Sequence, residues 1–131
     1  STSRRQRQMC IRDRILLYPV ITMESGDTHG GSRHNLLGPD ATPELTRKFS
    51  NEQQVTDHTP QAFITLSSDD EGVPPANGVN YYLALQKHKV PATLHIYPTG
   101  GHGWGFYDSF AYKRQWTEEL EKWLQDGVRF Q

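Results

Sequence analysis

Short apolar runs alternate with longer polar segments along most of this chain. Three of the runs, at residues 15–21, 62–66 and 93–97, have the length of single strands. The first is almost continuously apolar and rich in β-branched residues, which favours a strand buried on both faces of a parallel sheet. The pattern therefore predicts three strands, with Pro19 near the end of the first.

Three further segments are predicted to be helical. A short helix is expected from Pro43 to Phe49, because Thr42 can cap it and proline fits a first helical turn. A second helix is expected over residues 76–88. The third repeats apolar residues at the spacing of one helical face, and these are Trp116, Leu120, Trp123 and Leu124. The segment 22–43, rich in Gly, Ser, Asn, Asp and Pro, is predicted to be a long loop.

The alternation of strands and helices is typical of an α/β domain with a mainly parallel sheet and flanking helices. Right-handed crossover connections place the loops that follow successive strands at one edge of such a sheet. Ligands bind outside the carboxyl ends of parallel strands. Residues with catalytic chemistry are therefore expected in the loops that follow the strands.

Composition limits the class of protein and its partners. The 131 residues suffice for one domain, and 34% hydrophobic and 22% charged residues are ordinary for a soluble protein. No apolar stretch reaches the about 18 residues needed to span a bilayer, so no membrane partner is expected. The net charge of −1 predicts no nucleic-acid partner, and Cys10 is a single cysteine without a partner for an internal disulfide.

Residues 1–14 differ from the rest of the chain, being basic and almost free of apolar side chains. One interpretation is a disordered basic tail for an anionic partner. A second comes from the genetic code, because residues 4–13 can be encoded by DNA that resembles a transposase-based sequencing adapter with its mosaic end. We favour the second interpretation, in which residues 1–14 are a non-native, disordered tail and residues 15–131 are the native domain.

Two polar segments, residues 67–74 and 98–105, directly follow predicted strands. The first contains Asp70, and the second places His102 between glycines that leave its imidazole unobstructed. One helix and one strand separate them, so the parent strands are expected to be neighbours, with Asp70 and His102 within hydrogen-bond reach. A carboxylate beside a histidine fixes its tautomer and stabilises the imidazolium, which is the acid–base half of a nucleophilic triad.

These motifs resemble the carboxyl-terminal part of the α/β-hydrolase fold. The sequence D-x-x-V-P begins at Asp70 after a strand, and G-G-H-G surrounds His102 after the next helix and strand. The segments ILLYPV, THGGSRHNLLG and TPELTRKFSNEQQVT are similar to bacterial esterases related to acetyl-xylan and feruloyl esterases. The resemblance covers residues 15–131 and implies the truncated C-terminal half of such a domain, with three strands of its mainly parallel sheet.

The resemblance implies a serine hydrolase that cleaves carboxylic esters, acetyl or related acyl groups on carbohydrate, without a cofactor. His102 would act as its general base, and Asp70 would orient that base. The family nucleophile lies in G-x-S-x-G, a motif that this sequence does not contain. The nucleophile and the missing N-terminal half of the domain are therefore expected upstream, and the chain alone is expected to be inactive. A periplasmic or secreted parent is compatible with the resemblance.

Several other residues could take part in the chemistry or only support the structure. Trp104 either lines the acyl or sugar pocket as a substrate-binding residue or packs beneath the histidine loop. Asp69 is expected to structure its loop rather than to act as the acid. Ser32 does not lie in a nucleophile elbow, and Arg33 is expected to order the segment around it. The 6 histidines are scattered without H-E-x-x-H or cysteine-pair spacing, so no metal site is expected.

Two other functions are compatible with the same motifs. Serine peptidases of the prolyl-oligopeptidase type share the Asp and His motifs, and they carry a large propeller domain before the hydrolase domain. A non-catalytic binding or scaffold module on the same fold is the third interpretation. The upstream sequence distinguishes the three, because it contains the nucleophile elbow, the propeller or neither.

Overall fold

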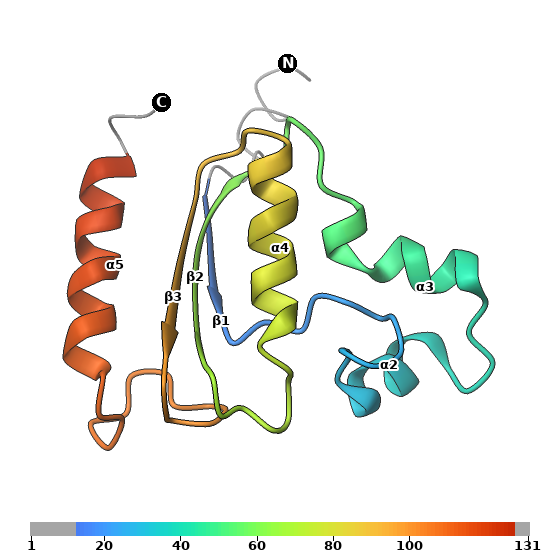
Figure 1. Cartoon of the computed structure of the whole chain (residues 1–131), viewed down its shortest axis with the longest axis horizontal. Coiled ribbons are helices and arrows are strands. Elements are labelled where there is room, and N and C mark those ends of the chain that lie inside the picture. Colours follow the sequence, from blue (N-terminus) through green and yellow to red (C-terminus); the bar gives the residue numbers. More distant parts are fainter. Residues whose placement is uncertain (1–12, 128–131) are drawn as a thin grey trace, which may run out of the picture.

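The computed structural model describes residues 13–127, which form a parallel sheet with helices on both faces (Figure 1). The strands lie side by side in the order β1 (Asp13–Leu17), β2 (Gln61–Ser67) and β3 (Ala92–Tyr97). Both ladders are parallel, as the sequence predicts, and Phe63 lies opposite Ile15 on one side and Thr93 on the other. The segments that follow β2 and β3 therefore leave the sheet at the same edge.

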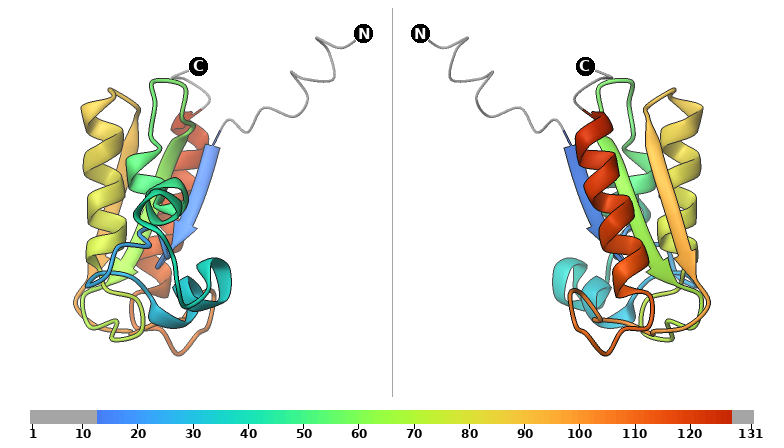
Figure 2. Two further views of the ribbon diagram at one scale, coloured as in Figure 1. Left: turned by 90° about the vertical axis from the view of Figure 1, so that its right-hand side faces the viewer. Right: turned by 90° about the vertical axis from the view of Figure 1, so that its left-hand side faces the viewer.

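Helices α4 (Ala76–Lys87) and α5 (Lys113–Gly127) cover opposite faces of the sheet (Figure 1). The right-hand view of Figure 2 shows α5 in front of the strands, with α4 behind them. The connection between β1 and β2 contains the shorter helices α2 (Gly30–Leu37), α3 (Pro43–Phe49) and the 3-10 helix η1 (Asn51–Gln53). No helix among residues 13–127 is long and apolar enough to cross a membrane.

The central strand β2 is covered on both faces by hydrophobic side chains. Ile64 packs on the α4 side with Tyr81, and both are at most 1% exposed. Phe63 points to the other face and packs with Trp116 of α5, and both are fully buried. Burial of each such large apolar side chain contributes about 1.5–3 kcal/mol, so β2 forms a rigid base for the loop that follows it.

The first strand differs from its predicted bounds of 15–21. It ends at Leu17, because Tyr18 has a φ of 37° and turns the chain out of the extended conformation. Ile21 lies beyond this turn and is still only 4% exposed. The prediction of a strand buried on both faces is wrong, because β1 is an edge strand of the described sheet, contains no buried residue and leaves Ile15 44% exposed. Only residues 15–17 of the apolar run belong to the strand.

The start of β1 bears on the interpretation of the N-terminal tail. Asp13 and Arg14 belong to the segment interpreted as non-native, yet they pair with Gln61 and Ala62 of β2. Residues 1–12, the remainder of that segment, lie outside the described residues. The strand thus begins two residues before the predicted start of the native domain.

The prediction of an uninterrupted loop over residues 22–43 is wrong, because α2 occupies Gly30–Leu37. His29 caps this helix, and its Nδ1 accepts a hydrogen bond from the backbone N–H of Ser32 at 3.1 Å. Gly38 ends the helix with a φ of 79°. The helix has no buried residue, so it lacks the apolar face by which a helix is found in a sequence.

The predicted helix from Pro43 to Phe49 forms with the expected cap. The side-chain oxygen of Thr42 accepts a hydrogen bond from the backbone N–H of Leu45 at 3.1 Å, and Pro43 lies in the first turn. The other two predicted helices correspond to α4 and α5. The local signals of capping and periodicity were therefore sufficient for these three elements.

Candidate active site

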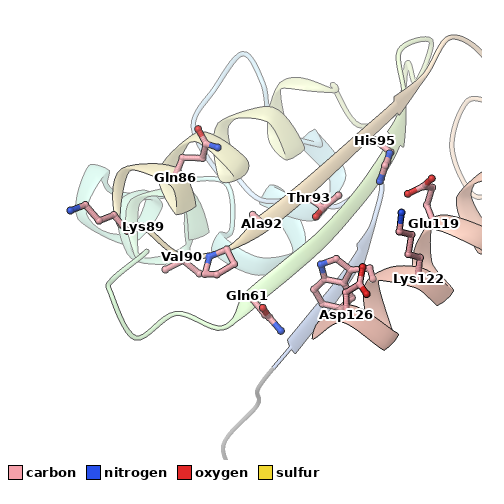
Figure 3. A pocket seen from close by; sticks show the side chains of 12 residues that line it. Gln61, Gln86, Lys89, Val90, Ala92, Thr93, His95, Glu119, Lys122 and Asp126 are labelled. Carbon is pink, nitrogen blue, oxygen red and sulfur yellow. The ribbon is translucent and has the colours of Figure 1, made fainter. Parts of the chain in front are cut away.

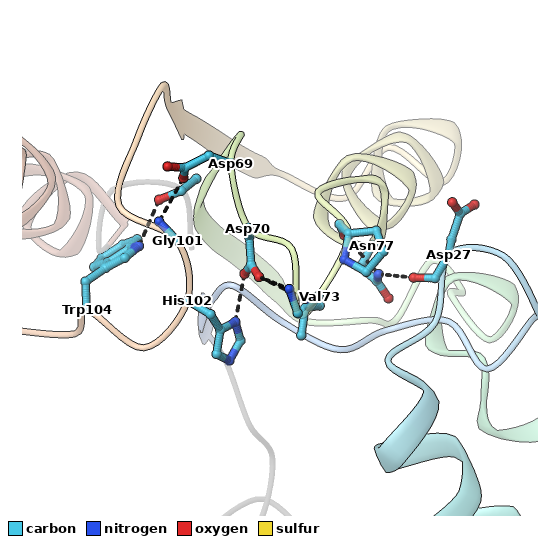
Figure 4. Close-up of polar contacts among 11 residues, drawn as sticks. Asp27, Asp69, Asp70, Val73, Asn77, Gly101, His102 and Trp104 are labelled. Carbon is cyan, nitrogen blue, oxygen red and sulfur yellow. Dashed lines mark hydrogen bonds and ion pairs between the residues drawn. The ribbon is translucent and has the colours of Figure 1, made fainter.

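The carboxyl ends of β2 and β3 lie next to each other, because Ser67 and Tyr97 are partners in the ladder. The segments that follow these residues bring Asp70 and His102 together at that edge (Figure 4). Asp70 Oδ2 lies 2.7 Å from His102 Nδ1, a distance typical of a charge-assisted hydrogen bond. The two side chains therefore meet as the sequence predicts.

Asp70 is fixed by its own loop. Its Oδ1 accepts hydrogen bonds from the backbone N–H groups of Gly72 at 3.0 Å and Val73 at 2.9 Å, and its side chain is 2% exposed. These contacts leave Oδ2 for His102. Because a carboxylate only accepts hydrogen bonds, the proton in the contact with His102 is carried by Nδ1.

His102 is partly open to solvent, with 43% of its side chain exposed. Since Nδ1 donates to Asp70, the other ring nitrogen, Nε2, is an acceptor in the neutral imidazole. A histidine in this tautomer can take a proton from a hydroxyl group that approaches Nε2. The buried carboxylate stabilises the imidazolium that forms, so the pair is suited to general base catalysis.

Asp69 holds the backbone of the histidine loop. Its Oδ1 accepts a hydrogen bond from the N–H of Gly101 at 2.8 Å (Figure 4). Its Oδ2 accepts one from the N–H of Gly100 at 3.3 Å. This is the structuring contact that the sequence predicts for Asp69. The carboxyl group beside the imidazole belongs to Asp70.

Trp104 is only 4% exposed. Its Nε1 donates a hydrogen bond to Ser67 Oγ at 2.9 Å, and its ring stacks on Phe110 with 4.0 Å between ring centroids. Trp104 therefore packs beneath the histidine loop, and it also lines the hollow beside His102, so its role in substrate binding stays a prediction. Its indole N–H is occupied by Ser67, and its ring face is occupied by Phe110.

Gly100 is required where the histidine loop crosses these packed rings. Its φ is 133°, a conformation that residues with a Cβ rarely adopt. A Cβ at this position would lie 2.4 Å from Phe110 Cε1 and 2.9 Å from Ser67 Oγ. The loop can approach the core this closely only with glycine at this position.

A hollow of about 360 Å³ opens beside His102. Tyr107 forms part of its wall and is 68% exposed, and the adjacent Phe106 is 64% exposed. The other lining residues are Thr99, Gly100, Gly103, Trp104, Ser109, Phe110 and Ala111. A reactant that meets His102 would therefore lie close to exposed aromatic surface.

A larger cleft, of about 690 Å³, lies at the opposite end of the sheet (Figure 3). It is lined by Gln61 and Ala92, the first residues of β2 and β3, and by Trp123 of α5. Neither Asp70 nor His102 belongs to its lining. Although this cleft is larger, it is not the candidate active site, because it contains neither residue of the pair.

Two ionisable groups outside the pair have shifted pKa values. Burial raises the pKa of the Tyr97 phenol, and the negative charge of Glu119 adds to the effect. The hydrogen bond and charge of Lys113 lower the pKa of Asp108, which is on the surface. Tyr97 therefore stays neutral and Asp108 stays charged around neutral pH, so neither group exchanges protons there.

Ser32 is engaged in the cap of α2. Its Oγ lies 2.8 Å from His29 Nδ1, which also accepts the Ser32 backbone N–H. Arg33 Nε donates a hydrogen bond to the carbonyl of Met23 at 2.8 Å, so Arg33 orders this segment as predicted. Among residues 13–127 no group of three or more His, Cys, Asp or Glu side chains could hold a metal ion.

Sequence reasoning missed Asn77, which supports the acid loop. Its Oδ1 accepts hydrogen bonds from the backbone N–H groups of Ile21 at 2.9 Å and Thr22 at 3.0 Å. Its Nδ2 donates to the carbonyl oxygens of Asp27 at 2.6 Å and Pro74 at 2.9 Å (Figure 4). The only local signal was an amide residue after two prolines, and the contacts to residues 21–27 could not be foreseen from it.

Comparison with known proteins gives relatives over most of the chain. An acetylxylan esterase of Xylanibacter ruminicola is 39% identical over 115 residues, which are 85% of this chain and 24% of that protein. The crystal structure of an acetyl ester-xyloside bifunctional hydrolase from Caldicellulosiruptor lactoaceticus superposes with a TM-score of 0.84 at 38% identity, over 88% of this chain and 42% of that one.

A carboxylesterase structure from Lactobacillus plantarum matches with a TM-score of 0.71 at 26% identity, over 89% of this chain and 45% of that one. The chain thus spans less than half the length of each of these three relatives. The sequence pattern of the prolyl oligopeptidase family matches residues 17–129. The chain therefore belongs to the prolyl oligopeptidase family and has the α/β-hydrolase fold.

Proposed function

We propose that this chain carries the acid and the base of a serine hydrolase that removes acetyl or related acyl groups from carbohydrate. The observation that carries the proposal is the contact of 2.7 Å between Asp70 Oδ2 and His102 Nδ1 at the carboxyl edge of the sheet. The relatives named as an acetylxylan esterase and an acetyl ester-xyloside hydrolase support an acylated sugar as substrate.

In the proposed reaction, His102 Nε2 takes the proton of a serine hydroxyl as its oxygen attacks the ester carbonyl carbon. The imidazolium, stabilised by Asp70, then gives this proton to the oxygen of the leaving sugar, and an acyl-enzyme remains. In the second half His102 removes a proton from water, which attacks the acyl carbon. Release of the carboxylic acid returns the proton to serine, so the catalyst is restored.

The serine itself is proposed to lie upstream, in a G-x-S-x-G elbow whose backbone N–H groups help to form the oxyanion hole. The greater length of the relatives supports this part of the proposal. The proposal therefore requires, as the first partner of Asp70 and His102, an N-terminal half of the domain that would supply the serine. The chain alone is expected to have no esterase activity, because an imidazole without a nucleophile forms no acyl-enzyme.

A peptidase is the second candidate, because the matching family is named for prolyl oligopeptidase. It has less support, since the similar proteins named above are esterases. The two functions differ in the bond that is cleaved. The esterase releases acetate from an acetylated sugar, whereas the peptidase cleaves an amide bond on the carboxyl side of proline.

The test is to recover the complete reading frame from genomic DNA, purify its product and assay it against acetylated xylan and a proline-containing peptide amide. The proposal predicts an upstream elbow serine and release of acetate, with no cleavage of the peptide. The 131-residue chain, assayed in parallel, should release none. A complete protein that carries the elbow and cleaves only the peptide would establish the second candidate instead.

A further inference from the structure

Tyr18 adopts an unusual backbone conformation at the edge of the sheet where Asp70 and His102 meet. Its φ is 37°, and among the described residues only one other non-glycine residue, Lys89, has a positive φ. This conformation is unfavourable for a residue with a Cβ, and it persists only where surrounding contacts hold it. Its backbone N–H donates a hydrogen bond of 2.8 Å to the carbonyl of Thr65, which anchors the turn to β2.

The side chain of Tyr18 lies against the catalytic imidazole. The ring centroids of Tyr18 and His102 are 4.3 Å apart with an interplanar angle of 60°. The same tyrosine ring contacts the buried Trp104 edge-on, at 5.1 Å between centroids. The Tyr18 ring therefore lies in contact with both His102 and the buried Trp104 beneath the histidine loop.

The histidine loop is rich in glycine, so few of its own side chains pack against His102. Its four glycines all have positive φ values: 133° at Gly100, 64° at Gly101, 85° at Gly103 and 43° at Gly105. The hydrogen bond to Asp70 fixes the position of Nδ1. It does not by itself fix the plane of the imidazole ring, so the ring can still rotate. The Tyr18 ring, in close tilted contact with the imidazole, limits rotation of the imidazole and so fixes the direction in which Nε2 points.

We infer that Tyr18 is a positioning residue whose aromatic ring sets the plane of the His102 imidazole. The inference rests on the proposed function, because Nε2 must face the serine hydroxyl for proton transfer. It assigns the role to the ring rather than to the phenol, because it is the ring that contacts both His102 and Trp104. A phenylalanine at this position should therefore serve as well as tyrosine.

The first test is spectroscopic and uses the 131-residue chain without any catalysis. The ring proton resonances of His102 are followed by NMR in the wild type, Tyr18→Phe and Tyr18→Asn. Asparagine tolerates the left-handed conformation, so it removes the ring with the least disturbance of the backbone. We expect Tyr18→Asn to shift the His102 ring protons towards solvent-exposed values and Tyr18→Phe to leave them near the wild-type values.

Tyr82→Asn is the matched control, because Tyr82 is a partly buried tyrosine of α4 that packs on the core between α4 and the sheet and makes no aromatic contact with His102 among the described residues. It should not move the His102 resonances. Unchanged His102 resonances in Tyr18→Asn would overturn the inference. If Tyr18→Asn does not fold, Tyr18→Leu, which keeps an apolar side chain of similar burial, replaces it in the same comparison.

The second test uses the complete hydrolase. We expect Tyr18→Asn to lower kcat about 10- to 100-fold while KM changes less than about twofold, because a misdirected base slows chemistry more than binding. Tyr18→Phe should restore kcat to within about twofold of the wild type. A wild type without ester hydrolysis would refute the proposed function. An active wild type with equally active Tyr18→Asn, or with Tyr18→Phe as slow as Tyr18→Asn, would refute the positioning role alone.

Discussion

The two oxygens of Asp70 have different partners, and this division determines the tautomer of His102. Oδ1 is bound by the N–H groups of Gly72 and Val73, whereas Oδ2 faces His102 Nδ1. As long as Oδ2 is an acceptor, the proton stays on Nδ1 and Nε2 remains free to take another. A hydrogen-bond donor in the place of Oδ2 would require Nδ1 to accept, so the proton would move to Nε2, which could then take no other.

Asp70→Asn makes that replacement with almost no change of shape. The amide oxygen takes the place of Oδ1, because both backbone N–H groups need an acceptor, and the amide nitrogen then faces His102. We expect kcat of the complete hydrolase to fall about ten-thousandfold, as for the equivalent change in serine proteases, with little change in KM. Steady-state kinetics with acetylated xylan measure it.

The control is Asp69→Asn, which leaves an amide oxygen to accept the hydrogen bond from Gly101. It should retain most of the activity, because Asp69 supports the loop without touching the imidazole. If Asp69→Asn lost the activity and Asp70→Asn kept it, the acid would be assigned to the wrong aspartate.

At the scale of elements, the site depends on loops that are held from several directions. Asn77, at the start of α4, is 1% exposed; it binds the segment after β1 through three hydrogen bonds and the carbonyl of Pro74 through a fourth. Gly100 lets the loop after β3 pass over Phe110 and Ser67. Each of these residues connects elements that are far apart in the sequence.

Asn77→Ala should lower the free energy of unfolding by about 3 kcal/mol, because buried N–H and C=O groups lose their partners without access to water. Urea denaturation followed by circular dichroism measures the change in this chain. Asn80→Ala, at an exposed position in the same helix, is the control and should change it by less than about 0.5 kcal/mol. Equal effects of the two substitutions would mean that the hydrogen bonds of Asn77 contribute nothing specific.

Gly100→Ala should lower the free energy of unfolding by about 3 kcal/mol, because the new Cβ both strains the backbone and meets Phe110. Gly103→Ala shares a positive φ but has no atom within 4 Å of the Cβ, so its cost should be nearer about 1 kcal/mol. The same urea experiment compares them. An equal loss in both would show that strain alone, without the steric contact, explains the requirement for glycine.

Much of this arrangement could be predicted, because periodicity, capping residues and parallel connections are local signals. They gave the strand pairing, three helices and the meeting of Asp70 with His102. Helix α2 was missed because it buries no side chain, and its cap at His29 is a histidine rather than a usual capping residue. Tyr18 and Asn77 were missed because their roles depend on a positive φ and on distant backbone groups, neither of which leaves a pattern in the sequence.

At the scale of the whole molecule, the site sits on a sheet whose central strand is packed from both sides. The cores formed by α4 and α5 meet at β2, and the loop carrying Asp70 continues directly from this strand. Trp104, which packs in the α5 core, ties the histidine loop to the same base. The scaffold therefore holds Asp70 and His102 in contact, and in the proposed function it would present Nε2 to the nucleophile.

The most direct test of this account is the rate of acetate release from acetylated xylan by the complete hydrolase and by its His102→Gln variant. Glutamine can still donate a hydrogen bond to Asp70, so the variant should fold, but it has no nitrogen that takes a proton. We predict that kcat falls at least about a thousandfold while the thermal unfolding midpoint stays near that of the wild type. A folded His102→Gln variant that releases acetate at the wild-type rate would contradict the assignment of His102 as the base.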